Sequence, residues 1–149
     1  MTRFEALQAD LTEAILAAWP AAEGQIRFGA VQQPFKSSET SAVVRSVLTR
    51  ERVGRQVVER FRVEIEGMFP RMGLPADTDT ALYGLGDLLA VQIAPHCDDE
   101  DDLAAIARSQ FGSRWFDPAV TSITPLDAAP EDKRLGVMVE ISLATVVLQ

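Results

Sequence analysis

The stretch "FRVEIE" (residues 61–66) decides the fold, because its side chains repeat with a period of two. Phe61, Val63 and Ile65 are apolar, and the residues that follow each of them are charged. Successive side chains of a strand point to opposite faces, so this stretch has one apolar face and one ionic face. It predicts a half-buried strand whose apolar face lies against the core.

The residues before this strand predict a long hairpin. Residues 42–50 have a spacing that a helix also accepts, but their valine content favours a strand. The stretch "ERVGR" (residues 51–55) contains Gly54, which suits a tight turn. We therefore predict strands over 42–50 and 56–69, joined by a turn near Gly54.

Six arginines fall within this predicted hairpin, and we expect them along its exposed face and tip. They are the candidate residues of a subunit or partner interface: Arg45, Arg50, Arg52, Arg55, Arg60 and Arg62. The acidic residues gather elsewhere, at 77–79 and 98–102. One interpretation is a solvated charged face. The other is that the basic stretch of one copy meets an acidic stretch of another, since opposed patches guide association.

Two segments have the apolar spacing of amphipathic helices. In "TRFEALQADLTEAILAAW" (residues 2–19), apolar residues recur every three or four positions, Thr2 and Glu5 fit a capping box, and Pro20 ends the run. A second helix is predicted over residues 79–93. Its Gly84 and Gly86 form a G-x-G, but no preceding strand or third glycine supports dinucleotide binding. Close packing of the helix is the favoured interpretation.

Shorter strands complete the predicted sheet. Residues 26–30 alternate briefly and predict a short strand. Residues 118–148 predict two strands joined by a charged turn, the last with apolar residues at every second position from Leu135 to Leu143. The fold class expected is α+β, with an antiparallel sheet of four to five strands, two main helices packed on it and the long hairpin. With 149 residues and 47% apolar positions, the chain has the size of a single domain, residues 1–149.

Charge and composition narrow the class of protein. The net charge of −8 repels a phosphate backbone, so sequence-specific DNA binding is not expected. The longest apolar run, at residues 14–22, is far shorter than the roughly 20 residues of a membrane span, and no signal peptide is predicted. One cysteine cannot form an internal disulfide, which suits a reducing compartment.

The run "HCDDEDD" (residues 96–102) holds the only histidine and the only cysteine of the chain. A zinc site commonly needs two or more His or Cys ligands that converge, and a calcium site needs oxygens on a folded loop. Adjacent carboxylates do neither, and the run lacks the glycine and glutamate of an EF-hand. Aspartates at a helix start accept bonds from free backbone amides. We therefore predict a short helix beginning here and no metal site.

The sequence contains no recognisable catalytic motif. The sequence has no G-x-S-x-G elbow and no phosphate-binding G-x-x-x-x-G-K-[ST], and any Ser-His-Asp arrangement would have to use His96. Nothing selects one pair of the 22 acidic residues for acid–base work. We expect no catalytic residue and no cofactor, so the protein is predicted not to be an enzyme.

The order of elements resembles that of the tail terminator and tail completion proteins of long-tailed bacteriophages. The resemblance covers most of the chain, through "RFEALQADLTEAILAAW", "RFRVEIEGMF", "DTALYGLGDLLAVQI" and "KRLGVMVEISLATVVL". The segment 95–115 is longer than this pattern requires. The resemblance implies a structural virion protein that forms a hexameric ring, caps the tail tube, ends its polymerisation and provides the head–tail joining surface.

The same resemblance implies partners and a location. The partners are further copies of the chain, the tail tube protein and the head–tail connector protein, and DNA passes through the ring without being bound in a sequence-specific way. The location is the head-proximal end of the virion tail, after assembly in the host cytoplasm. Two other classes stay open: a small ligand-binding or metal-dependent enzyme domain, which needs a pocket with convergent polar groups, and a nonviral interaction module that forms no closed ring.

Overall fold

The computed structural model describes residues 2–29, 39–71, 78–94, 115–126 and 134–148. Its elements are α1 (Arg3–Ala18), the short 3-10 helix η1 (Pro20–Ala22), β1 (Ile26–Phe28), β2 (Ser41–Val53), β3 (Gln56–Pro70), α2 (Thr78–Ile93), β4 (Phe116–Leu126) and β5 (Arg134–Leu148). The predicted α+β class is confirmed. The predicted helix start after "HCDDEDD" lies outside the described residues.

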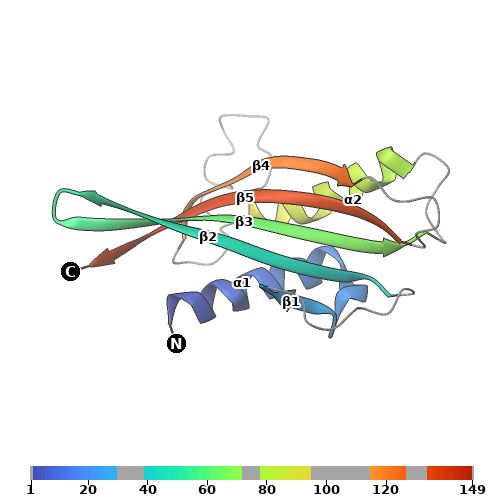
Figure 1. Cartoon of the computed structure of the whole chain (residues 1–149), viewed down its shortest axis with the longest axis horizontal. Helices are drawn as coiled ribbons and strands as arrows, with labels where there is room; N and C mark the ends of the chain where they lie inside the picture. The colour runs from blue at the N-terminus through green and yellow to red at the C-terminus, as the bar shows by residue number, and fades with distance from the viewer. Residues whose placement is uncertain (1, 30–38, 72–77, 95–114, 127–133, 149) are drawn as a thin grey trace, which may run out of the picture.

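The five strands form one sheet in the order β1-β2-β3-β5-β4 (Figure 1). Three of the four neighbouring pairs are antiparallel, as predicted, whereas β1 runs parallel to β2. Strands β2 and β3 pair along the whole length of the hairpin, from Ser41 opposite Met68 to Val53 opposite Gln56. Gly54 in its turn has φ +64°, a conformation that glycine adopts without strain, which fits the predicted turn.

Both helices cover the same face of the sheet, and the core lies between this face and the helices. In β3, the residues with odd numbers from Glu59 to Phe69 are buried, which confirms the alternation in "FRVEIE". The matching residues of β5, from Leu135 to Leu143, are buried opposite them. Helix α1 begins with the predicted capping box of Thr2 and Glu5. No helix in the described segments is long and apolar enough to cross a membrane.

Two tryptophans join the helices to the sheet. Trp19, at the end of α1, donates from Nε1 to the carbonyl of Leu85 in α2 (2.9 Å) and packs edge-on against Phe69. A Cβ atom on Gly67 would lie 2.8 Å from the Trp19 ring, so this glycine makes room for the indole. Trp115 donates from Nε1 to Asp10 of α1 (2.7 Å). The sheet and both helices therefore form one packed unit.

Of the two glycines in α2, only Gly86 is needed for close packing. A Cβ atom there would overlap Ile123 Cγ2 and lie 3.3 Å from Val137 Cγ2, whereas a Cβ atom on Gly84 has no neighbour within 4 Å. The predicted close packing is thus confirmed for Gly86 and wrong for Gly84.

These two positions make a matched test of the packing. Gly86→Ala should lower the free energy of unfolding by about 1–3 kcal/mol, because α2 must move away from the sheet. Gly84→Ala should raise it by up to about 1 kcal/mol, because alanine favours a helix. Urea denaturation measures both changes, and equal effects of the two substitutions would contradict this packing.

Candidate subunit interface

The six arginines predicted as interface residues are all exposed, but they do not share one face. The side chains of Arg45, Arg60 and Arg62 lie on the face of the sheet opposite the helices, as the register of β2 and β3 requires. Those of Arg50 and Arg52 lie on the helix side, and Arg55 is in the turn. The prediction of a single arginine face is therefore wrong, because even-numbered and odd-numbered residues of one strand point to opposite faces.

Arg50 has a structural partner that the sequence analysis missed. Its Nε donates to Glu59 Oε2 (2.8 Å), and Arg3 at the start of α1 donates from Nη2 to the same oxygen (3.0 Å). Arg3 Nε is also paired with Glu59 Oε1. The Glu59 side chain is fully buried, and two arginines from different elements compensate its charge. This ion-pair cluster fixes the start of α1 to the hairpin.

The charge of Glu59 is favoured by these neighbours. Burial raises the pKa of this carboxyl, and the hydrogen bonds and charges of Arg3 and Arg50 lower it. Together the two arginines have the larger effect, so the pKa of Glu59 lies below the ordinary value. Glu59 is therefore ionised at neutral pH. Phe4 adds to the cluster, because the Arg3 guanidinium lies 4.6 Å from the centre of its ring.

Beyond Glu59 the sheet continues as a three-stranded arm, defined here as residues 51–58 and 146–148, and neither α1 nor α2 covers it. Figure 1 shows the β2–β3 hairpin and the end of β5 projecting past α1. Gln56 still pairs with Leu148, so β5 supports the hairpin almost to its turn. The arm carries five valines that are exposed or half-buried: Val53, Val57, Val58, Val146 and Val147. Val57 and Val147 lie on the helix side of the arm, and Val53, Val58 and Val146 lie on the opposite face. Contiguous exposed apolar surface is typical of interaction sites.

The arm and the helices carry opposite charge. Arg52 and Arg55 lie on the arm, where Glu51 is the only acidic residue. Helices α1 and α2 contain a single basic residue, Arg3, which is bound to Glu59. Their exposed acidic residues, together with the one that follows η1, are Glu5, Glu13, Glu23, Asp79 and Asp87. Of the acidic stretches predicted to oppose the arginines, Asp79 lies at the start of α2, whereas residues 77 and 98–102 lie outside the described segments. The helices carry an acidic surface that this prediction did not name.

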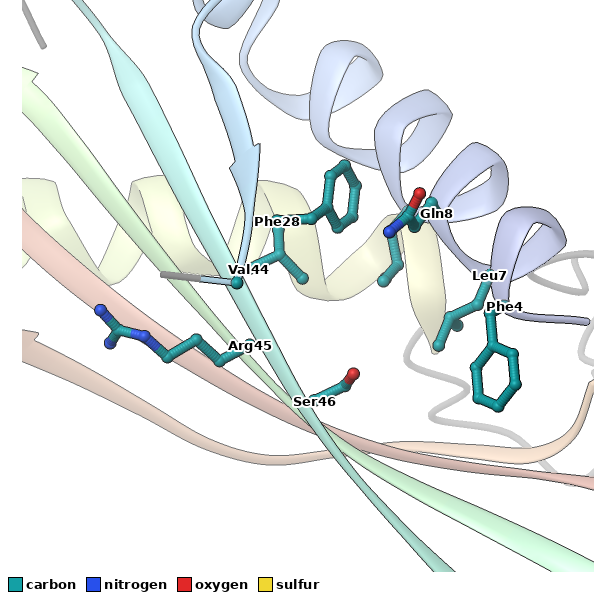
Figure 2. Close-up of a pocket in the computed structure, with 9 residues that line it drawn as sticks. Phe4, Leu7, Gln8, Phe28, Val44, Arg45 and Ser46 are labelled. Atoms are coloured by element: carbon teal, nitrogen blue, oxygen red, sulfur yellow. The ribbon is translucent and has the colours of Figure 1, made fainter. Parts of the chain in front are cut away.

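A groove of about 710 Å³ lies between α1 and the strands β1 and β2. Figure 2 shows Gln8 and Leu7 of α1 on one side and Phe28 of β1 on the other, with Arg45 pointing away from the helix. Its described lining residues are Phe4, Leu7, Gln8, Leu11, Phe28, Gly29, Val44, Arg45 and Ser46. Arg45 is the one charged residue among them, so this lining offers no acid–base pair.

A second groove, of about 500 Å³, lies between the end of α2 and β4. Its described lining comprises Ala90, Ala94 and residues 118–123, and it contains no ionisable side chain. In the described ranges, no three His, Cys, Asp or Glu residues come close enough together to hold a metal ion. His96 and Cys97 lie outside those ranges.

Comparisons with known proteins do not assign the chain to a family. No protein-family model matches the chain, and no curated protein matches it. A solved structure without a descriptive name covers 95% of this chain and 96% of its own, with 11% sequence identity and a TM-score of 0.39. At this TM-score the likeness carries no argument about function.

Proposed function

We propose that this protein is a structural subunit that assembles into a ring and caps the tail tube of a long-tailed bacteriophage. In this role it ends tail polymerisation and presents the surface to which the head is joined. The observation that carries the proposal is the arm, which presents valines and arginines beyond α1 and α2. The resemblance in the order of elements adds the particular role.

The charge pattern supports a head-to-tail contact between copies. The basic arm of one copy fits the acidic helices of the next, and the two surfaces belong to different parts of the chain. A contact between two different surfaces produces a ring when the rotation between copies closes. The valines of the arm would then be covered by the neighbouring copy, which removes exposed apolar area from water.

The arm arginines provide the first test. Arg52→Glu combined with Arg55→Glu should raise the dissociation constant of the ring at least about tenfold, because like charges then face each other. Arg50 is kept, since its loss would uncover Glu59. Light scattering over a concentration series measures the change, and added salt should weaken the unmodified ring.

The matched control is Arg60→Glu combined with Arg71→Glu, which changes the net charge equally at two exposed residues outside the arm. It should leave the ring intact. An unmodified protein that stays monomeric at every concentration, or an arm variant that assembles like the unmodified protein, would count against the proposed ring.

The tail role has a separate test. Genes for capsid, tail tube and tape measure proteins beside this gene would support the tail role, and their absence would contradict it.

A further inference from the structure

The two sides of the sheet differ in how well they are protected from pairing with a further strand. At one side, β4 contains Pro118 and Pro125, and its pairing with β5 is interrupted by two register shifts. Prolines and irregularities of this kind obstruct the addition of a further strand. At the other side, β1 covers β2 only from Ala42 to Val44. In the part of the chain that the structure describes, no strand lies against this edge of β2 beyond Val44.

The hydrogen bonds to β1 show which backbone groups are left at this edge. Ala42 donates to the carbonyl of Gln25 (2.9 Å), and the carbonyl of Val44 accepts from Gly29 (2.8 Å). The backbone groups of even-numbered residues in β2 therefore face the β1 side. By the same alternation, the N–H and C=O groups of Ser46, Leu48 and Arg50 face the uncovered edge.

The side chains along this edge are complementary to themselves when the strand is reversed. Arg45 and Glu51 are both exposed on the face opposite the helices, and neither forms an ion pair with a described residue. They lie three positions before and three positions after Leu48. An antiparallel copy centred on Leu48 therefore places each Arg45 opposite a Glu51, and Val47 opposite Thr49.

We propose that β2 pairs through this edge with β2 of a second copy, in antiparallel orientation and centred on Leu48. The contact is twofold symmetric, so the Arg45–Glu51 pair occurs twice. Ser46 of one copy then lies opposite Arg50 of the other, and their backbone groups bond across the join. The groove of Figure 2 opens beside Val44 and Ser46, which leaves room on the helix side for incoming side chains.

Other registers match these side chains less well. A copy centred on Thr49 puts Arg45 opposite Val53 and Val47 opposite Glu51. A copy centred on Val47 puts Arg45 opposite Thr49. A shift that pairs even-numbered with odd-numbered residues turns the backbone groups of one strand away from the other. Only the register centred on Leu48 joins opposite charges.

A charge exchange tests the pairing. Arg45→Glu and Glu51→Arg should each raise the dissociation constant of the dimer about tenfold, because each change sets two like-charged pairs across the join. The double variant restores opposite charges and should return within about threefold of the unmodified protein. Arg60→Glu, a control on the same face of β3, should have little effect. Analytical ultracentrifugation over a concentration series measures these constants.

Cross-linking tests the register directly. In a Cys97→Ser background, Val47→Cys with Thr49→Cys should form a covalent dimer on mild oxidation, since residues of a non-hydrogen-bonded antiparallel pair lie at a distance that a disulfide spans. Each single variant should form far less. A double charge variant that stays as weak as the single ones, or cysteines that give no covalent dimer, would overturn the proposal. A twofold contact needs only two chains. The Arg52 and Arg55 variant should therefore still form this dimer when it no longer forms the ring, so the two proposals can fail separately.

Discussion

Replacing Phe61 with alanine is expected to lower the free energy of unfolding by about 3–5 kcal/mol. Phe61 is only 2% exposed, and its ring packs edge-on against Phe4 and Trp115, with centroids 6.1 and 5.7 Å away. The substitution leaves a cavity where α1, β3 and the start of β4 meet. Chemical denaturation followed by tryptophan fluorescence measures the loss.

Phe4→Ala is the control for this prediction. Phe4 touches the same ring but is 45% exposed, so less apolar surface returns to water when it is removed. We expect a loss of about 1 kcal/mol from this change. Similar losses for Phe4→Ala and Phe61→Ala would mean that Phe61 is not the centre of the cluster.

Replacing Glu59 with glutamine should lower the free energy of unfolding by about 2 kcal/mol at pH 7. Hydrogen bonds to a charged group contribute about 1.5–3 kcal/mol, and both arginines remain partly in contact with water, which reduces the effect of their loss. For a chain of this length the midpoint of thermal unfolding should fall by about 4–8 °C. Glu13→Gln, on the exposed side of α1, should change it little.

The pH dependence of this difference has a definite sign. The pKa of Glu59 is lower in the folded state than in the unfolded chain. Its contribution to stability is therefore fully present above the unfolded pKa and is lost as the pH falls through the folded pKa. Unmodified protein and Glu59→Gln should therefore differ most at neutral pH and converge in acid. A difference that grows as the pH falls would contradict the ion-pair cluster.

Much of the fold could be predicted because three segments have strong periodic patterns. The strand around Phe61 and the strand from Leu135 to Leu143 both repeat every two residues, and α1 has a capping signal at Thr2. The direction of β1 could not be predicted, because alternation is the same in parallel and antiparallel strands. The place of β5 between β3 and β4 could not be predicted either, since it depends on pairing between distant residues.

The candidate interface was only partly visible in the sequence. The arginines stand out by number, but their division between two faces follows from the turn at Gly54, which fixes Arg50 opposite Glu59. Glu59 has the same parity as Phe61 and Val63, so the alternation could have marked it as an inward-facing carboxylate. Its second partner, Arg3, is 56 residues away in the chain, and no local pattern indicates that contact.

The position of β5 has a consequence for how the chain folds as it is made. β5 is the last of the five strands along the sequence, yet it pairs on both sides, with Val63 opposite Ile141 and Ile123 opposite Val139. Until it is synthesised, β4 has no neighbour, and the apolar faces of β3 and both helices lack their central partner. A nascent chain therefore exposes this surface until β5 has been made, so folding should be slow and should benefit from a chaperone.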